Sequence, residues 1–343
     1  MRIAAVSSPV TPLRPAQSGG AQSAVTHLAV GLAARGHHVT LYCAEGSRVD
    51  GVEIVTVPVD SRAVGQGLVM PGGPPPQPSL ELDSAIGRLF VEVERRGADA
   101  VSQHAFDAAA FERSRGLPVL HTLHLPPIVE SVLHAARGEP ASKLAAVSEA
   151  GRRDWAAAGV EVGYVLRNGV ETSLPRHGPV LRMALAAGRL SPEKGFDHAA
   201  RAARLAGLPL RVVGLPYAPG YLPDLDGAEL MGPLPRAELT RLMAESAVTI
   251  CAVRWEEPFG LVAAEAQMAG CPVAGYRRGA LPEVIEEGIS GILVEPDDVE
   301  TLGTAVRDCL RLDRGAVRAS ALRRLAIEGM LDEYERALKS VAA

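Results

Sequence analysis

The sequence predicts an α/β protein that contains two doubly wound parallel sheets. Its 343 residues exceed the roughly 250–300 at which a single core stops growing, which indicates two domains. Short apolar runs alternate with longer helical patterns along the chain, as in parallel sheets covered by helices on both faces. The alternation stops in a stretch with prolines and glycines at residues 171–180 and then starts again. This stretch is the expected linker.

The first array of strands and helices precedes this linker. Strands are expected at residues 3–7, 38–43, 52–57, 98–102, 118–122, 144–147 and 163–166. The clearest helices are expected at residues 21–35 and 80–96, and Gly36 is a favoured C-terminal cap for the first of them. Residues 71–78 are too rich in proline for a helix or a central strand, so they are expected to form a surface loop.

The second array follows the linker. Strands are expected at residues 183–187, 210–213, 248–252, 272–275 and 291–294, with helices between them. Residues 331–338 have a helical pattern that follows the last strand–helix unit and adds no strand. In doubly wound sheets, ligands bind at the carboxyl ends of the strands, so the loops that follow these strands are where functional residues are sought.

Composition argues against several classes of protein. Only 4% of the residues are aromatic and the net charge is −5, which disfavours a nucleic-acid partner. No apolar run reaches the roughly 18 residues of a membrane span, and a cytoplasmic protein is expected. The four cysteines form no CxxC pair and no metal-ligand spacing, so buried reduced thiols are expected and a metal site is not.

The segment after the expected strand at residues 248–252 carries the most chemistry. Pro258 suits the first turn of a helix expected at residues 259–269, and Gly260 lets a ligand approach the backbone closely. The free N–H groups of such a helix start favour an anion such as a pyrophosphate. Glu257 and Glu265 can bind hydroxyl groups at different parts of one extended ligand. A sugar nucleotide carries a pyrophosphate and has such hydroxyls on both its ribose and its hexose.

These residues resemble a known family. Glu257-Pro-Phe-Gly260, with Glu265 closing an E-x7-E spacing, resembles the signature of family 4 glycosyltransferases. Four further segments are similar to the family: Gly188-Arg-Leu-Ser-Pro-Glu-Lys-Gly195, Gly270-Cys-Pro-Val, Gly279-Ala-Leu-Pro-Glu283 and Gly291-Ile-Leu-Val294. The resemblance implies the GT-B fold, with two Rossmann-like domains facing a cleft. Residues 1–172, plus a helix at 329–343 that packs back on them, would form the acceptor side, and residues 173–328 would bind the nucleotide sugar.

The resemblance also implies the reaction. A hexosyl group would move from a nucleoside diphosphate sugar, with UDP or GDP as the nucleotide, to a hydroxyl of a small-molecule or lipid-linked acceptor. Transfer would retain the anomeric configuration. A cationic pair such as Arg189 and Lys194 can do the work of a divalent metal at the pyrophosphate, so no metal and no other cofactor is expected. Two alternatives stay open: a sugar-nucleotide epimerase on the same fold, and a protein that binds sugar nucleotides without catalysis.

The implied donor site lies mainly in the second half. Arg189 and Lys194 would neutralise the pyrophosphate, although such residues alone are more often surface charges. Glu257 would bind hexose hydroxyls and Glu265 the ribose. The backbone N–H groups of Phe259, Gly260 and Leu261 would reach the hexose or phosphate, and backbone groups around Met231 would contact the base.

The first half contributes fewer candidates. Gly19 and Gly20 follow the first strand and resemble a family loop at the donor pyrophosphate; a dinucleotide fold is disfavoured because G-x-G-x-x-G is absent. Asn168 resembles a residue at the family's interdomain hinge, and is otherwise a turn residue. His124 takes the place of a family histidine near the donor sugar and acceptor. With Arg189, Lys194 and Glu257 it completes the expected catalytic group, which contains no nucleophile.

Overall fold

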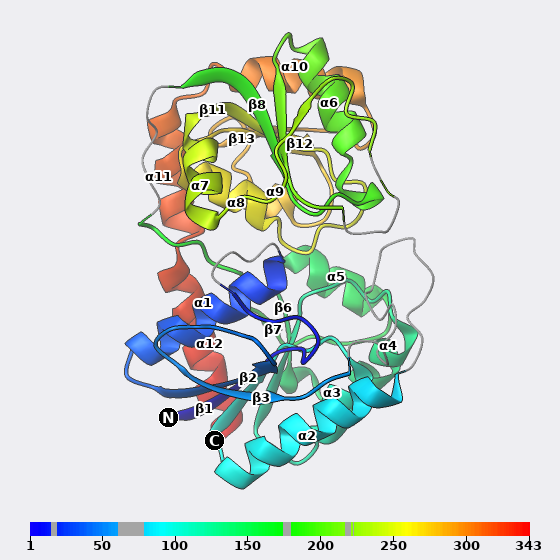
Figure 1. Ribbon diagram of the computed structural model, residues 1–343, viewed down its shortest axis with the longest axis vertical. Helices are drawn as coiled ribbons and strands as arrows, with labels where there is room; N and C mark the ends of the chain where they lie inside the picture. Colours follow the sequence, from blue (N-terminus) through cyan, green and yellow to red (C-terminus); the bar gives the residue numbers. More distant parts are fainter. Residues whose placement is uncertain (15–18, 61–78, 174–179, 217–220, 222) are drawn as a thin grey trace. The chain divides into compact units, whose positions relative to one another are not determined.

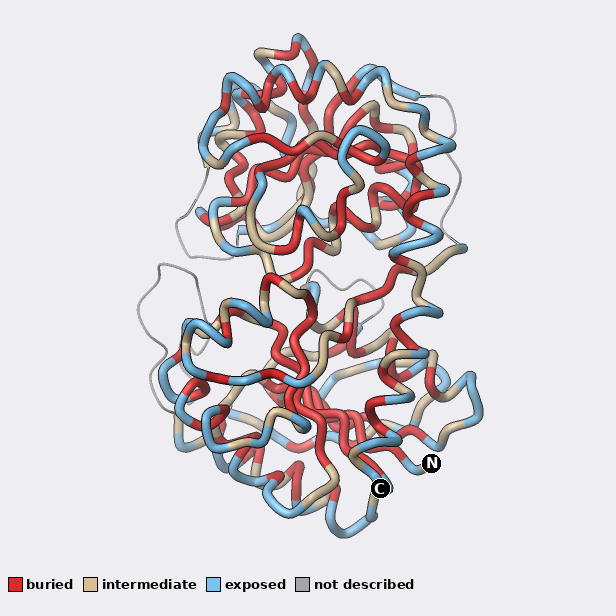
Figure 2. Tube along the Cα trace, turned by 180° about the vertical axis from the view of Figure 1, so that it is seen from behind, coloured by how far each residue is buried: buried red, intermediate tan, exposed pale blue. Residues whose placement is uncertain are grey.

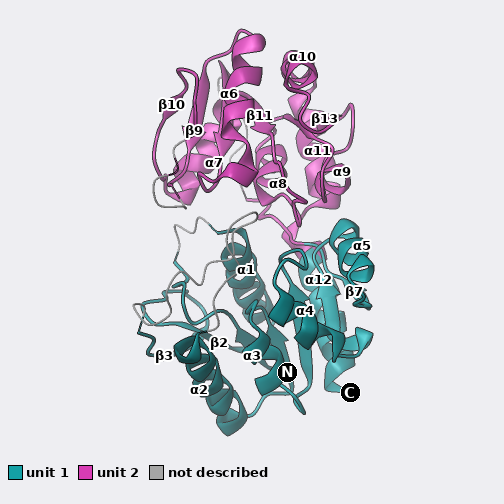
Figure 3. Cartoon of the chain, turned by 90° about the vertical axis from the view of Figure 1, so that its right-hand side faces the viewer, with its two compact units in different colours: residues 1–167, 330–343 teal, residues 168–329 magenta. Residues whose placement is uncertain are grey.

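A computed structural model describes residues 1–14, 19–60, 79–173, 180–216, 221 and 223–343; the loop expected at residues 71–78 lies outside them. The chain divides into two compact units (Figure 3), one formed by Met1–Arg167 with Met330–Ala343 and the other by Asn168–Gly329. The first boundary between the units therefore follows Arg167, five residues before the expected boundary at residue 172. Most of the expected linker, residues 174–179, is also outside the described part of the chain.

Unit 1 is built on a seven-stranded parallel sheet in the order β3-β2-β1-β4-β5-β6-β7. Its strands are β1 Arg2–Val6, β2 His38–Ala44, β3 Glu53–Val57, β4 Ala100–Gln103, β5 Val119–Leu123, β6 Leu144–Ala146 and β7 Tyr164–Val165. The central strands β4, β5 and β6 are buried along their whole length, because helices cover both faces of the sheet (Figure 2). The strand order reverses between β1 and β4, where ligands of doubly wound sheets bind.

Two of the helices described in unit 1 begin with a serine side-chain cap. The helices of this unit are α1 Gly20–Ala34, α2 Leu80–Arg96, α3 Ala108–Arg113, α4 Glu130–Arg137 and α5 Glu149–Ala157, with a 3-10 turn η1 at Ala141–Lys143. In α2, the Ser79 hydroxyl caps the helix by accepting from the Leu82 N–H. Ser148 caps α5 in the same way, accepting from the Gly151 N–H. The helix expected at residues 80–96 is therefore confirmed to the residue.

Unit 2 has a six-stranded parallel sheet in the order β10-β9-β8-β11-β12-β13. Its strands are β8 Leu181–Ala187, β9 Leu210–Val213, β10 Glu229–Leu230, β11 Ser246–Cys251, β12 Val273–Tyr276 and β13 Gly291–Val294. Strand β10 is an exposed pair of residues held by β9 alone, and the sequence pattern did not predict it. The order reverses between β8 and β11, so the loops after these two strands begin side by side.

Helices cover this second sheet and complete a small-residue core. They are α6 Phe196–Leu205, α7 Arg236–Glu245, α8 Leu261–Met268, α9 Leu281–Val284, α10 Val299–Cys309 and α11 Arg314–Arg324, with a 3-10 turn η2 at Pro192–Lys194. Alanines from β8 and α6 lie against each other in the core, which lets helix and sheet approach closely. The four cysteines are buried and free, as expected from their spacing.

The last helix, α12 (Ile327–Ala342), begins in unit 2 and packs on unit 1 (Figure 1). Its Leu331 fits against Gly31 of α1, where an added Cβ would lie 2.6 Å from the leucine methyl carbons. Its buried Tyr334 donates a hydrogen bond to the Thr122 hydroxyl on β5 at 3.2 Å. No helix in the described ranges is both long and apolar enough to cross a membrane.

Candidate active site

The loops that follow β8 and β11 carry the first group of expected site residues. Gly195 ends η2 with φ +62°, and a Cβ there would lie 2.0 Å from the Ala252 carbonyl oxygen. Only glycine allows the turn to approach the end of β11 this closely. The adjacent Glu193 carbonyl accepts from the Arg254 N–H at 2.8 Å. Two segments about 60 residues apart in sequence are thereby joined, and the side chains that follow them meet.

The meeting side chains are Lys194, Glu257 and Trp255. Lys194 Nζ lies 2.6 Å from Glu257 Oε2, and the two side chains are only 19% and 12% exposed. Trp255 Nε1 donates to the same carboxylate oxygen at 2.8 Å, and the Lys194 ammonium lies 5.1 Å from the centre of the Trp255 ring. Lys194 and Glu257, expected at different parts of the donor, are brought into direct contact. Trp255 is an addition that the sequence pattern did not single out.

Arg189 is held separately from this cluster. Its Nη2 lies 3.1 Å from Glu193 Oε1, and Ser191 Oγ donates to the same oxygen at 2.5 Å. Glu193 is buried, and its second oxygen, Oε2, has no hydrogen-bond partner among the described residues. The Glu193 carboxylate therefore fixes the Arg189 guanidinium. The i,i+4 spacing of these two residues was the signal available in the sequence.

The loop before α8 departs from the expected helix start. The helix begins at Leu261, so Pro258 lies outside its first turn, and Gly260 takes the cap position with φ +93°. This left-handed residue prevents the helix from starting at residue 259. Within the described residues, the backbone N–H groups of Phe259, Gly260 and Leu261 donate to no other group, although the Phe259 side chain is buried. Three free donors thus remain together at the helix start.

A second glycine fixes Glu257 from the other side. Gly279 has φ +54°, and a Cβ there would lie 2.3 Å from both the backbone nitrogen and oxygen of Glu257. Ala280 N–H donates to the Glu257 carbonyl at 2.8 Å. The side chain of the neighbouring Glu256 accepts from the Gly279 N–H at 2.8 Å. The segment at residues 279–282 therefore positions the loop at residues 256–260.

Glu265 lies farther along α8 and has its own partner. Arg236 of α7 lies 3.1 Å from Glu265 Oε1, and the glutamate side chain is 12% exposed. Burial raises the pKa of Glu265, and the nearby Arg236 guanidinium offsets part of this rise. Glu265 pairs with Arg236 and Glu257 with Lys194, so in the described part of unit 2 the two carboxylates have separate cations.

Met231 and Asn168 are the remaining expected residues of unit 2. Met231 follows β10, and its N–H donates to the Val212 carbonyl at 2.9 Å, which leaves only its backbone carbonyl for a ligand. Asn168 is buried, and its Oδ1 has no hydrogen-bond partner among the described residues. Two residues later, Val170 pairs with the segment that leads into α12 through hydrogen bonds to Leu325 and Ile327.

In unit 1, His124 follows β5 and is buried with a second histidine. His104, directly after β4, places Nδ1 2.9 Å from His124 Nε2, and Ser102 Oγ lies 2.8 Å from His104 Nε2. His121 points into the core instead, stacked on Phe111 of α3 with the ring centres 4.3 Å apart. The sequence drew attention to His124, whereas His104 was missed although it follows a strand at the point where the strand order reverses.

Gly19 and Gly20 begin helix α1. Gly19 takes the cap position, its carbonyl accepts from the Ser23 N–H at 3.1 Å, and Gly20 is exposed. No side chain caps this helix start. The Gln22 side chain lies against Gly19, where an added Cβ would be 2.0 Å from its Oε1. Gly19 and Gly20 lie after β1 and His104 after β4, the two strands between which the strand order of unit 1 reverses.

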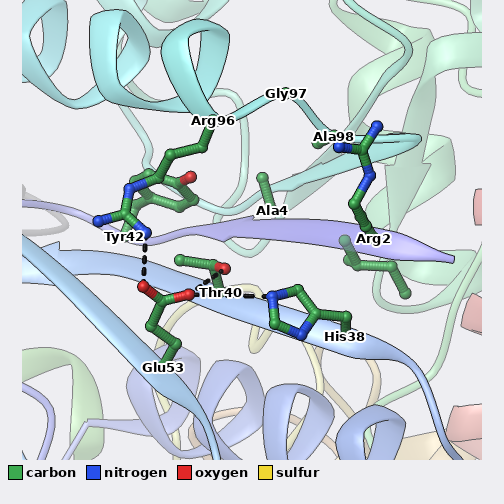
Figure 4. Close-up of a pocket in the computed structure, with 10 residues that line it drawn as sticks. Arg2, Ala4, His38, Thr40, Tyr42, Glu53, Arg96, Gly97 and Ala98 are labelled. Carbon is green, nitrogen blue, oxygen red and sulfur yellow. Dashed lines mark hydrogen bonds and ion pairs between the residues drawn. The ribbon is translucent and has the colours of Figure 1, made fainter.

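A pocket of about 220 Å³ lies at the opposite edge of this sheet, where its strands begin (Figure 4). Its cations are already compensated: Arg96 pairs with Glu53 at 2.5 Å, and Arg2 pairs with Asp99 at 3.4 Å. This pocket is not at the ligand-binding edge of a doubly wound sheet. Across the described residues there is no group of three or more His, Cys, Asp or Glu side chains that could hold a metal ion.

Two family models match the chain. Residues 18–174 match the model described as Glycosyltransferase Family 4, and residues 182–311 match Glycosyl transferases group 1. Similar curated proteins include the D-inositol 3-phosphate glycosyltransferases of Mycobacterium marinum (34% identical over 171 residues, covering 46% of this chain and 36% of that protein) and Mycobacterium tuberculosis (32% over 182 residues, 46% and 38%). The chain thus matches little more than a third of the length of these curated relatives.

Solved structures match over the whole chain. A glycosyltransferase involved in avilamycin A biosynthesis, AviGT4, has a TM-score of 0.74 at 22% identity, covering 100% of this chain and 98% of that one. Anabaena Alr3699/HepE in complex with UDP-glucose has a TM-score of 0.76 at 18% identity, covering 99% and 100%. These likenesses establish the GT-B fold with its two Rossmann-like units. The two family models together span both units, and the chain belongs to the family 4 glycosyltransferases.

Proposed function

We propose that this protein transfers a hexosyl group from a nucleoside diphosphate sugar to an acceptor hydroxyl, with retention of configuration and without a metal ion. The cluster at the ends of β8 and β11 carries the proposal. There, the ammonium of Lys194, the carboxylate of Glu257 and three free backbone N–H groups are held by a loop that Gly279 and Gly195 fix in place. Such a site offers cations and N–H donors to phosphates and a carboxylate to hydroxyls.

The cationic part of the site suits the leaving group. As the bond from the hexose to the diphosphate breaks, negative charge grows on the phosphate oxygens. Lys194, Arg189 and the free N–H groups at the start of α8 would stabilise that charge, the task that a divalent cation performs elsewhere. Arg189 is preset for this role because the buried carboxylate of Glu193 holds its guanidinium.

The two glutamates suit the two ends of the donor. Glu257 accepts hydrogen bonds from Lys194 and Trp255 and would exchange one of them for a hexose hydroxyl. Glu265 would accept from the ribose hydroxyls, with Arg236 holding its carboxylate. The carbonyl of Met231 would contact the base. UDP-hexoses are the first donors to test, since the HepE structures contain UDP and UDP-glucose.

Unit 1 would bind the acceptor. His124 would lie at the sugar and acceptor, Gly19 and Gly20 would offer backbone to the donor phosphates, and Asn168 would act at the connection between the units. A small-molecule or lipid-linked acceptor is proposed. The curated relatives are named for D-inositol 3-phosphate, so this phosphorylated polyol belongs in the acceptor panel.

The test has two steps. Thermal unfolding in the presence of UDP-, GDP-, ADP- and dTDP-hexoses identifies the donor, because a ligand that binds the folded state raises the apparent stability. That donor is then incubated with the protein, with and without acceptors, in EDTA. Acceptor-dependent release of the nucleoside diphosphate supports the proposal. An isomerised sugar in the absence of acceptor would indicate an epimerase, and binding without turnover a non-catalytic protein.

A further inference from the structure

A chain of three polar side chains runs through unit 1 from strand β4 to the end of β5. Ser102 and His104 are two residues apart and share one face of the extended backbone. Ser102 Oγ lies 2.8 Å from His104 Nε2, and His104 Nδ1 lies 2.9 Å from His124 Nε2. The chain ends at His124 Nδ1, which makes no hydrogen bond with a described residue and is not enclosed, so it reaches solvent.

Both histidines are neutral. Ser102 is fully buried, and His104 and His124 are each 6% exposed. Burial lowers the pKa of His124 to about 4 and places the pKa of His104 well below its usual value, with the neighbouring His124 adding to the second effect. At neutral pH each ring therefore carries one proton, and the question is which nitrogen holds it.

Only two arrangements of protons fit the three side chains. In the first, the Ser102 hydroxyl donates to His104 Nε2, His104 Nδ1–H donates to His124 Nε2, and the His124 proton is on Nδ1. In the second, every bond is reversed: His104 Nε2–H donates to Ser102 Oγ, His124 Nε2–H donates to His104 Nδ1, and His124 Nδ1 is a bare acceptor. The hydrogen-bonding capacities of serine and of neutral histidine allow both.

The Ser102 hydroxyl decides between them. It has no other hydrogen-bond partner among the described residues, so in the second arrangement its hydrogen would be buried without an acceptor. Leaving a buried donor unsatisfied disfavours a state by roughly tenfold to hundredfold. The first arrangement leaves no buried donor unsatisfied, because its only free N–H, at His124 Nδ1, reaches solvent.

We infer that Ser102 and His104 are positioning residues that hold His124 as its Nδ1–H tautomer, so that His124 presents an N–H donor to its ligand. The oxygen that receives this hydrogen bond belongs to a sugar hydroxyl or to a phosphate. His124 then acts as a neutral hydrogen-bond donor and does not remove the proton of the acceptor hydroxyl. Only the identity of the ligand rests on the proposed function; the tautomer rests on the side chains of unit 1.

Tyr334 supports the arrangement from α12. Its ring centre lies 6.0 Å from that of His104, with the rings tilted by 33°, and its hydroxyl donates to Thr122 Oγ1 at 3.2 Å. Thr122 is on β5, two residues before His124. The last helix therefore packs against the middle of the chain of polar groups and fixes the orientation of the His104 ring.

The tautomer can be measured without any ligand. In protein labelled with ¹⁵N in its histidine rings, the signals of His124 are those lost in His124→Asn, and their shifts distinguish a protonated nitrogen from a bare one. We expect a protonated Nδ1 and a bare Nε2 in the wild-type chain at neutral pH. A bare Nδ1 would overturn the inference. In Ser102→Ala, we expect the bare-Nδ1 form to become populated; an unchanged spectrum would remove Ser102 from the account.

A kinetic comparison tests what the N–H does. Asparagine places an amide N–H near the position of Nδ1, so His124→Asn should keep kcat within about tenfold of wild type, while His124→Ala should lose about a hundredfold. His104→Asn, which keeps a donor to His124, should likewise have a higher kcat than His104→Leu. Equal loss in His124→Asn and His124→Ala would contradict the donor role. Absence of transfer by the wild-type protein would refute the proposed function and leave the tautomer assignment standing.

Discussion

Lys194 and Glu257 form an ion pair with an N–O distance of 2.6 Å. Under the proposed function they serve different parts of the donor, so donor binding must separate them or share them with the ligand. Trp255 makes this exchange possible because its Nε1–H continues to hold the Glu257 carboxylate when the Lys194 ammonium turns to a phosphate. The three side chains therefore form one connected group.

Trp255 should therefore report donor binding. The chain has two tryptophans, and Trp155 is fully buried in the core of unit 1. A nucleotide sugar that moves the Lys194 ammonium, 5.1 Å from the Trp255 ring centre, changes the field at the indole. We expect a saturable change in fluorescence on donor addition that Trp255→Phe abolishes. Calorimetric binding with no change in wild-type emission would show that the cluster is not at the donor.

Glu265 gives a second prediction at this scale. Glu265→Ala should weaken binding of free nucleoside diphosphate and of nucleotide sugar by the same factor, roughly tenfold to hundredfold, because hydrogen bonds to a charged group contribute about 1.5–3 kcal/mol each and the ribose is common to both ligands. Titration calorimetry measures both affinities. Glu238→Ala, which removes an exposed carboxylate from α7, is the control. Unchanged affinity for the free nucleotide would refute the ribose assignment.

The sequence pointed to those site residues that lie within one short motif. Glu257, Glu265, Arg189 and Lys194 could be singled out by spacing and by their place after strands. Their partners could not. Arg236 comes from a different helix than Glu265, and the contact of Trp255 with Lys194 depends on how two distant loops fold together. Such pairings are properties of the packed structure, and a single sequence does not contain them in readable form.

At the scale of elements, glycines set the shape of the loop before α8, residues 256–260. The strands predicted from apolar runs are confirmed within one or two residues at most ends, because a buried parallel strand has a strong and simple pattern. The start of α8 was predicted two residues too early, and the strand β10 was not predicted. The left-handed Gly260 delays the helix, and a two-residue exposed edge strand has no pattern of its own.

Gly279 offers a sharp test of the loop. Gly279→Ala places a Cβ 2.3 Å from the Glu257 backbone, so we expect loss of donor affinity together with destabilisation of about 1–3 kcal/mol. Gly288→Ala is the matched control: its φ is also positive, at +76°, but no atom lies within 4 Å of the added Cβ. It should lower the melting temperature through backbone strain alone and leave donor affinity unchanged. Equal effects on donor affinity would show that Gly279 matters only through its backbone conformation.

The side chain that precedes helix α3 is expected to make the stability of unit 1 depend on pH. Burial, with a contribution from Asp83, raises the pKa of the Asp107 side chain to about 6. A carboxyl whose pKa is higher in the folded than in the unfolded state stabilises the fold below its unfolded pKa of about 3.9 and loses that contribution as pH rises through about 6. Asp107→Asn should stabilise unit 1 by about 1–2 kcal/mol at pH 8 and very little near pH 4. Denaturant unfolding at both pH values checks this, and a pH-independent effect would contradict it.

For the whole molecule, the sequence predicted two α/β arrays and a final helix without a strand. The structure gives two units of seven and six parallel strands, with α12 packed on unit 1 through Leu331 and Tyr334. The chain therefore passes between the units twice, after Arg167 and after Gly329. Just inside unit 2 these two passages are hydrogen-bonded to each other at Val170. The sequence indicated the final helix, but no periodic pattern in it showed that this helix packs on α1 and β5 of unit 1.

The most direct test of sugar transfer is to follow one reaction by NMR. The donor that most raises the melting temperature is incubated with an acceptor in excess EDTA, and the anomeric signals of donor and product are recorded together with the nucleotide phosphorus signals. We predict nucleoside diphosphate and a glycoside in equal amounts, with the product keeping the donor's anomeric configuration, at a rate that EDTA does not change. An inverted product, or activity that EDTA abolishes and magnesium restores, would contradict this account.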